Sequence, residues 1–478
     1  MSNTVQIAAT STGTTAVVLG ASIGGLLAAR ALADTVDRVI VLERDDAPEP
    51  GPAAPRRGVP QGRHTHALLA AGQEVLGDWF PGILEDLERA GAPTMRGGSG
   101  LWWQNGGYRV MTDLEGSAYA MSRPLLENLV LEHLEQTGNV EVRHGATVEG
   151  LCWDDAAGAP SVDGVSVEGE RLGAELVVDC TGRSSRFVTE LERAGYPAVP
   201  TSNIDVGVSY GTKLLRRRPG DLPCDADFAL VAPTPPAEVR GAVLLPIEDD
   251  RWTLTLVGMH GDTVPTDDAG FLEFARSLPD SPIGDLVADA QHLSRVMSYR
   301  YPSSQRRRFE RVRRHPVGYL GLGDVQCSFN PIYGQGMSSA ALQARELARV
   351  VARNGVRSPR LASKVYRSTA KVVDNPWTIA AGADFLHPST TGDKAPGTDL
   401  VNGYVGHVMS ATHSSPVVLE RMMEVTGLTR SPKDLMRPIF AMRVLAASRR
   451  ARRAQRSQGL RRPDGTALHV AVRHTAAA

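Results

Sequence analysis

Short apolar runs alternate with stretches of helical length in the first part of the chain, and this alternation predicts an α/β fold. Residues 16–19 (AVVL) and 38–42 (RVIVL) are typical of buried strands. Between them, residues 23–32 have the length and apolar content of a helix. Strand, helix and strand in this order predict a βαβ unit, in which a helical crossover joins two parallel strands.

The rest of the chain continues this alternation and then becomes mainly helical. We expect further strands at residues 140–144, 147–153, 162–168, 174–179, 242–247, 252–258 and 317–322. Helices are expected at residues 67–76, 124–136, 271–278, 283–290 and 337–354, with a mainly helical pattern thereafter. The interleaving predicts one discontinuous, nucleotide-binding type of α/β domain, into which a second, sheet-containing domain is inserted.

Composition narrows the class of protein. Hydrophobic residues make up 42% of the 478 residues and charged residues 22%, as in an average globular protein. The 52 basic residues balance 53 acidic ones, which argues against a globally basic nucleic-acid binder. The four cysteines form no CxxC pair, so neither a disulfide scaffold nor a zinc or other metal site is expected. Residues 1–15 lack the pattern of a secretory signal, and glycines and Arg30 interrupt the most apolar window, 16–33. We therefore expect a cytoplasmic protein with no transmembrane segment.

A glycine pattern lies where the first strand turns into the helix. Residues 20–25 read Gly-Ala-Ser-Ile-Gly-Gly. Gly20 permits a tight turn, the small Ser22 lets the backbone approach a pyrophosphate, and Gly25 allows close helix–strand packing. Glu43 ends the next strand and can accept hydrogen bonds from a ribose diol. Ser22 replaces the usual middle glycine, and a glycine pattern alone also fits an ordinary tight turn. Strand, helix and Glu43 together favour a dinucleotide site.

Two later motifs complete a resemblance to a known superfamily. Residues 179–186 read Asp-Cys-Thr-Gly-Arg-Ser-Ser-Arg, after an expected strand. Gly323-Asp324 is followed by 330–337, Asn-Pro-Ile-Tyr-Gly-Gln-Gly-Met. With residues 20–25 and Glu43, these motifs resemble the FAD-dependent flavoprotein monooxygenases. No second glycine fingerprint appears, which disfavours a disulfide reductase with two Rossmann domains.

The resemblance implies a division of the chain and a set of cofactor contacts. Residues 14–92, 120–205 and 300–375 would form a Rossmann-like FAD-binding domain, 93–119 and 206–299 a substrate domain, and 376–478 a helical C-terminal region with a basic tail. Residues of the three motifs, and basic residues near them, would contact FAD: Gly20, Ser22, Ile23, Gly24, Gly25, Glu43, Arg44, Arg63, Arg123, Asp179, Gly182, Asp324, Pro331, Gly334, Gly336 and Met337.

A narrower resemblance concerns the reaction. Residues 57–66 (RGVPQGRHTH), 330–339 (NPIYGQGMSS) and 374–377 (DNPW) are similar to the flavin epoxidases of bacterial polyether antibiotic biosynthesis, of the monensin and lasalocid type. This implies transfer of one oxygen atom from O2, through a flavin C4a-hydroperoxide, to an alkene of an apolar polyketide or terpenoid. An aromatic hydroxylase, a reductase or desaturase of the geranylgeranyl-reductase kind, and a non-catalytic FAD scaffold remain alternatives. A halogenase is set aside, because the tryptophans lack the Trp-x-Trp spacing of that family.

The remaining expectations concern the pocket and partners. Trp102, Trp103, Tyr210, Phe228 and Trp252 are candidate pocket residues, although an ordinary core role fits each one taken alone. The flavin itself carries the chemistry, and the sequence identifies no catalytic acid or base. Electrons would come from NAD(P)H directly or through a partner flavin reductase.

The C-terminal region carries a run of arginines without acidic residues, from 449 to 462. A solvated helix end explains it. The alternative is a docking site for an acyl carrier protein.

Overall fold

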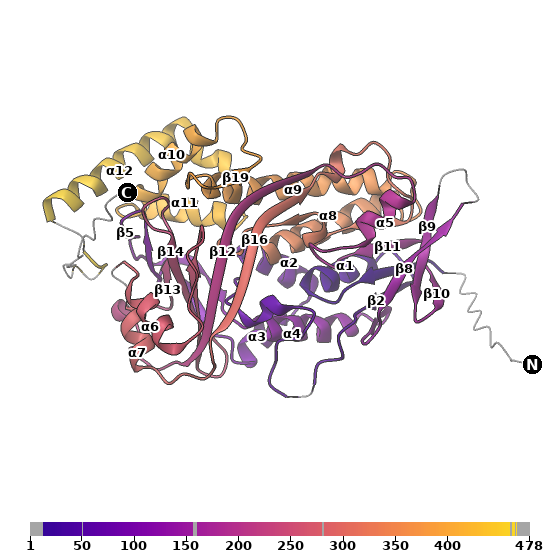
Figure 1. Ribbon diagram of the computed structural model, residues 1–478, viewed down its shortest axis with the longest axis horizontal. Helices are drawn as coiled ribbons and strands as arrows, with labels where there is room; N and C mark the ends of the chain where they lie inside the picture. Colours follow the sequence, from indigo (N-terminus) through magenta and orange to yellow (C-terminus); the bar gives the residue numbers. More distant parts are fainter. Residues whose placement is uncertain are drawn as a thin grey trace, which may run out of the picture.

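The computed structural model of the chain describes residues 13–49, 51–155, 160–279, 282–458, 461–463 and 465. Expectations for residues 1–12 and for the last residues of the basic tail lie outside the described residues. The predicted α/β fold with a helical C-terminal region is confirmed (Figure 1).

A five-stranded parallel sheet forms the first layer. Its order is β17 (Tyr319–Gly321), β11 (Leu176–Asp179), β1 (Thr15–Leu19), β2 (Arg38–Leu42) and β7 (Val140–Arg143). Neighbouring strands run parallel throughout. Successive side chains of a strand point to opposite faces, so β1 and β2 are buried on both sides and read as continuous apolar runs.

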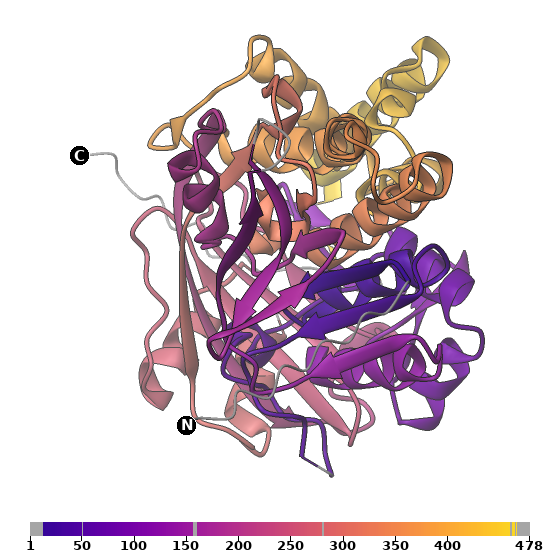
Figure 2. The same cartoon turned by 90° about the vertical axis from the view of Figure 1, so that its right-hand side faces the viewer.

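Helices cover one face of this sheet, with α1 (Ile23–Ala33) and α8 (Gly336–Asn354) in the shared core. Figure 2 shows the orange helices above the indigo strands. The other helices that pack in this core are α2 (Ala70–Trp79), α3 (Ile83–Arg89), α4 (Arg123–Glu135) and the first part of α9 (Leu361–Asp384). The opposite face packs against the antiparallel strands β8 (Val148–Asp154), β9 (Ser161–Val167) and β10 (Glu170–Gly173), and against α5 (Phe187–Arg193).

A second, mainly antiparallel sheet of nine strands lies beside this layer. Its long strands β12 (Thr201–Arg216) and β16 (Met297–Arg307) run between the two parts of the molecule (Figure 1). The other strands are β4 (Leu101–Gln104), β5 (Gly107–Tyr108), β13 (Ala229–Val231), β14 (Arg240–Ile247), β15 (Arg251–Gly258), β18 (Cys327–Ser328) and β19 (Thr391–Gly392). Helices α6 (Asp268–Arg276) and α7 (Ile283–Asp289) pack on one face. A separate pair, β3 (Thr94–Gly97) and β6 (Leu114–Tyr119), precedes α4.

The C-terminal region contains α10 (Thr398–Ala411), α11 (Pro416–Thr426) and α12 (Pro438–Gln458), which form their own apolar cluster. Two details differ from expectation. Strand β19 lies within this mainly helical part and pairs with β12. The helix expected from residue 67 begins at Ala70, because Leu69 is extended and its N–H donates to Ser338 Oγ at 2.9 Å.

Within the described residues, every helix is too short or too polar to cross a membrane.

Leu347 offers a test of the core between α8 and α1. Its side chain is fully buried, and its truncation in Leu347→Ala leaves a cavity, so the free energy of unfolding should fall by about 2–5 kcal/mol. The matched control is Leu400→Ala on α10, because Leu400 is 82% exposed and its truncation should change stability by less than about 0.5 kcal/mol. Urea unfolding followed by circular dichroism measures both; equal losses would contradict the packing described.

Candidate functional site

The glycine turn between β1 and α1 has no room for a side chain at Gly25. Gly20 has a φ of +92°, which glycine adopts at no steric cost. A Cβ added to Gly25 would lie 1.8 Å from the carbonyl oxygen of Gly20. At Gly24 the nearest atom would be the Cβ of Ala340, at 3.7 Å, which is ordinary contact. Gly25 therefore sets how closely helix α1 approaches the strand end.

Glu43 is buried directly beside this turn. Its carboxylate accepts hydrogen bonds from the N–H of Ala21 at 2.8 Å and of Asp45 at 3.0 Å, and pairs with Arg56 at 2.6 Å. Burial opposes ionisation, but the Arg56 guanidinium and these N–H groups outweigh it and lower the pKa of Glu43. Glu43 is therefore an anion that ties β2 to the turn.

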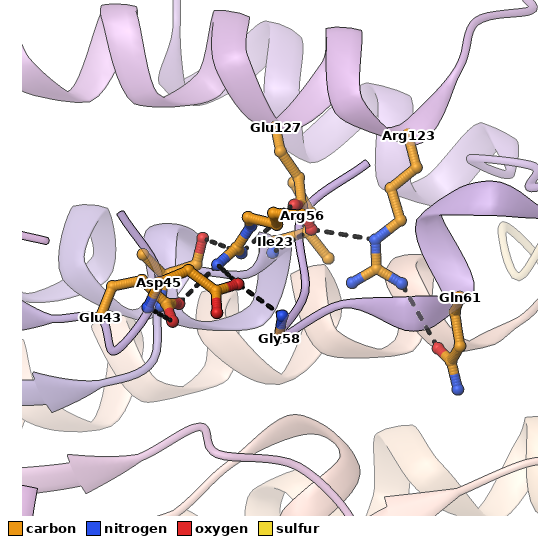
Figure 3. A network of polar contacts seen from close by, with 9 residues as sticks. Ile23, Glu43, Asp45, Arg56, Gly58, Gln61, Arg123 and Glu127 are labelled. Carbon is orange, nitrogen blue, oxygen red and sulfur yellow. Dashed lines mark hydrogen bonds and ion pairs between the residues drawn. The ribbon is translucent and has the colours of Figure 1, made fainter. Parts of the chain in front are cut away.

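Arg56 and Glu127 complete a charge network around the start of α1 (Figure 3). Arg56 donates to the carbonyl of Ala21 at 2.7 Å and pairs with Glu127 at 3.3 Å. Glu127 in turn accepts from the N–H of Ile23 at 3.2 Å and from Arg123 Nε at 2.9 Å. A carboxylate thus faces one N–H at the positive end of the helix, where a pyrophosphate would also bind.

Asp179 organises the second motif. It is fully buried and accepts from the N–H and hydroxyl of Thr181 at 2.9 and 2.6 Å, from the Ser185 hydroxyl, and from the Tyr319 hydroxyl at 2.8 Å. Gly182, with a φ of +89°, forms the turn of this loop. Both carboxylate oxygens are engaged within the protein, so Asp179 holds the loop in shape.

Asp324 and the turn after it form the third part of the site. Asp324 is half-buried and has no hydrogen-bond partner among the described residues. Burial raises its pKa, opposed by the nearby Arg123 and Arg183. Pro331 opens the turn, Gly334 takes a φ of +64°, and α8 starts at Gly336, where an added Cβ would meet nothing within 4 Å. The first N–H groups of α8 have no partner within the helix and are available to a ligand at its start.

The register of the parallel sheet brings the three motifs together. Leu19 pairs with Asp179, and Asp179 pairs with Gly321. Parallel strands that end at the same level place their following loops at one edge, the usual ligand edge of such sheets. The glycine turn, the open space at Gly336 and the unpartnered carboxylate of Asp324 fit a dinucleotide with an extended polar linker and a flat ring. The residues present therefore fit FAD.

A buried polar cluster lies next to the turn 330–334. The Asp384 carboxyl, at the end of α9, accepts from Asn330 Nδ2 and from the Tyr333 hydroxyl at 2.9 Å each, both at Oδ1. Its Oδ2 and the nearby Tyr210 hydroxyl are buried without partners among the described residues. Burial raises the pKa of Asp384 to about 7, against the two hydrogen bonds. When the carboxyl is protonated, the proton lies on Oδ2, because Oδ1 already accepts twice.

The candidate pocket residues separate into distinct places. Tyr210 lies near Tyr299 and His64, with ring centroids 6.4 and 6.1 Å away. Trp102 contacts Phe228 edge-on, with ring centroids 6.4 Å apart. Trp103 and Trp252 belong instead to the apolar cluster under α6 and α7. For these two, the structure shows the ordinary core role.

The positions of several charged residues differ from those expected from the sequence. Arg44 and Arg63 are exposed, whereas Arg123 is buried in the network around α1. Sequence reasoning missed Arg56, Glu127 and Asp384. Glu127 stands four residues after Arg123, and this helical ion-pair spacing could have indicated it. Arg56 and Asp384 carry no such signal.

His64 and His66 are both hydrogen-bonded within the protein. His64 Nδ1 lies 2.8 Å from Thr212 Oγ1, and His66 Nε2 lies 2.7 Å from the Gln61 carbonyl. Burial, with Arg63 nearby, lowers the pKa of His64 to about 4. Among the described residues no cluster of three or more histidine, cysteine or acidic side chains could hold a metal ion.

Gly25 and Gly24 provide a matched pair for testing the turn. Gly25→Ala forces its Cβ into the Gly20 carbonyl and should displace α1, weakening FAD binding at least tenfold, which corresponds to about 1.4 kcal/mol. Gly24→Ala should bind FAD nearly as the wild type does. Flavin absorbance after dialysis measures retention, and similar retention by both variants would refute this role of Gly25.

Asp384 predicts a pH dependence of stability. A folded-state pKa of about 7 lies above the ordinary value of 3.8, so the contribution of this carboxyl is present below pH 4 and is lost as the pH rises through 7. The free energy of unfolding of the wild type should therefore fall by an amount on the order of 4 kcal/mol between pH 4 and 8. In Asp384→Asn this fall should be absent. Urea unfolding across this range measures it. The control Asp250→Asn, at an exposed position, should keep the wild-type slope.

Comparison with known proteins identifies the family. Residues 13–213 match the family model described as FAD binding domain. The chain is 32% identical over 398 residues to Protein Rv3254 of Mycobacterium tuberculosis, covering 80% of this chain and 82% of that protein.

Two solved structures share the fold. One is the flavin-dependent brominase Bmp2, with a TM-score of 0.63 and 14% identity, covering 92% of this chain and 100% of that one. The other is pqsL of Pseudomonas aeruginosa, a probable FAD-dependent monooxygenase, with a TM-score of 0.56 and 20% identity, covering 78% and 97%. The chain therefore belongs to the same family as Protein Rv3254, and its residues 13–213 match the FAD binding domain.

Proposed function

We propose that this flavoprotein is an FAD-dependent monooxygenase that epoxidises an alkene of an apolar polyketide or terpenoid intermediate. The observation that carries the proposal is the meeting of all three motifs at one sheet edge, including the turn 330–336. A protein that only stored FAD would need the glycine turn, but not an open turn and helix start at the ring end. FAD would supply oxygen activation and transfer.

The chain's own residues would hold and orient the cofactor. Asp324 would accept hydrogen bonds from the ribityl hydroxyls, and Arg123 would lie near the phosphates or ribose. The N-terminus of α8, at Gly336 and Met337, would stabilise negative charge on the reduced ring. In this proposal residues 14–92, 120–205 and 300–375 bind FAD, and 93–119 and 206–299 shape the substrate side. In the same proposal, residues 376–478 are the helical C-terminal region.

The reductant and a protein partner belong to the same proposal. Electrons come from NAD(P)H, directly or through a flavin reductase. An acidic carrier protein would dock on the exposed arginines of α12: Arg449, Arg452, Arg453 and Arg456. Salt weakens contacts between exposed charges, so this docking should be salt-sensitive.

Isotope labelling tests the reaction. The FAD-loaded protein is reduced without oxygen, mixed with ¹⁸O2, and offered polyenes and aromatic compounds. We expect one ¹⁸O atom in the product of a polyene, with the mass of an epoxide. Label in a phenol instead would indicate aromatic hydroxylation. A product that gains or loses hydrogen without label would replace the proposal with a reductase or desaturase.

A further inference from the structure

Four cationic side chains are buried in the described part of the chain, and three of them have a carboxylate partner. Arg123 pairs with Glu127 at 2.9 Å, Lys213 with Asp268 at 2.6 Å, and Arg306 with Asp374 at 2.7 Å. The fourth, Arg109, is 4% exposed and has no acidic partner among the described residues. Arg109 is therefore the exception that needs an explanation.

Arg109 follows β5 and stacks on Trp102, with its guanidinium carbon 3.2 Å from the centre of the ring. Its Nη2 donates to Gln104 Oε1 and lies 4.0 Å from the sulfur of Met409. Its Nε and Nη1, and the Nε1 of Trp102, are buried without a partner in the described residues. The nearby His413 is neutral and supplies no counter-charge, because burial, with Arg109 adding to the effect, lowers its pKa to about 4.

This arrangement has a surplus of donors. A guanidinium keeps its charge at all ordinary pH values and only donates hydrogen bonds, as does an indole N–H. Burying such a charge without an anion is strongly unfavourable, even with an aromatic face beneath it. An acceptor that carries negative charge would satisfy both side chains at once.

The sheet register shows where the rest of a ligand would lie. Trp102 pairs with Leu230, Leu230 with Val243, Val243 with Thr255, and Thr255 with Thr212. Residues paired directly across strands point to the same face, so these five side chains form one row. Its first three members, Trp102, Leu230 and Val243, are apolar and partly exposed.

The row runs from Arg109 towards the part of the molecule that contains the candidate flavin site. At its far end, the hydroxyl of Thr212 lies 2.8 Å from Nδ1 of His64, beside the ring of Tyr210. Four strand spacings correspond to about 19 Å. An elongated molecule held at Arg109 can therefore extend over Trp102, Leu230 and Val243 towards His64 and Tyr210, as far as Thr255, which is buried beneath Thr65.

We propose that Arg109 and Trp102 bind the carboxylate of an elongated, otherwise apolar acid, whose chain lies along the partly exposed side chains of Trp102, Leu230 and Val243. The inference names the substrate class and rests on the proposed function. A carboxylate fits better than a phosphate, because one guanidinium and one indole N–H among Phe228 and Met409 would leave a dianion under-neutralised.

Binding of simple probes tests this site without turnover. The full chain saturated with FAD is titrated with hexanoate, octanoate and decanoate by calorimetry, and its Tm is measured with each. We expect the affinity to rise about fourfold per methylene, from about 0.8 kcal/mol of buried CH₂, and saturating decanoate to raise Tm by roughly 2 °C or more. Decanol and inorganic phosphate should bind at least tenfold more weakly.

Matched variants assign the effect to Arg109. Arg109→Met should abolish the preference for decanoate over decanol and should leave Tm without ligand no lower than in the wild type. Arg306→Met removes a buried arginine that has a partner, so it should lower Tm yet keep decanoate binding. Trp102→Phe keeps the stacking but loses the N–H, and should weaken decanoate about tenfold, the effect of one hydrogen bond.

Two results would overturn the inference: equal binding of decanol and decanoate by the wild type, or unchanged decanoate binding in both Arg109→Met and Trp102→Phe. Because no product is measured, failure here leaves the monooxygenase proposal standing. Conversely, failure of the ¹⁸O experiment leaves the acid-binding site intact.

Discussion

The level at which the parallel strands end governs the rest of this molecule. Leu19, Asp179 and Gly321 are neighbours across three strands, although 160 residues separate the first two in the chain. A loop follows each of these strands, and backbone hydrogen bonds alone do not stabilise it. Buried groups hold these loops: Glu43 holds the first, and Asp179 holds the second. A one-residue slip between strands would turn their side chains to the opposite face and separate the loops.

Charge in the interior follows two different patterns. Around α1, Arg56 and Arg123 are balanced by Glu43 and Glu127, so the network is complete within the protein. At Arg109 only an aromatic face and an amide oxygen are present. The first pattern fixes a geometry that exists before any ligand arrives. The second leaves a charge whose natural partner comes from outside the described chain.

Local sequence predicted the parts of the fold that depend on local rules. Apolar runs gave β1 and β2, helical spacing gave α8, and the glycines predicted the turn that the structure shows. Features that depend on contacts between residues far apart in the chain could not be predicted from local sequence. Ala70 starts α2 only because Ser338 holds Leu69 extended, and β19 forms only because β12 offers an edge.

The same limit applies to the site. Trp103 and Trp252 have the composition of pocket residues, and only the packing of α6 and α7 shows that they belong to a core. Asp384 is one aspartate among many in the sequence. Its raised pKa follows from burial beneath a turn more than 50 residues away, which no local pattern encodes.

The long ribbon of β12 and β16 has a mechanical consequence. Two antiparallel strands joined along their length resist stretching and bending in their plane, but they yield more easily to twist. Because this ribbon connects the parallel-sheet part with the larger sheet, relative motion of the two parts is expected to be a rotation about its axis. The bulge between Asp205 and Val208, where Gly207 has a φ of +60°, interrupts the ladder between the two strands and concentrates its twist there.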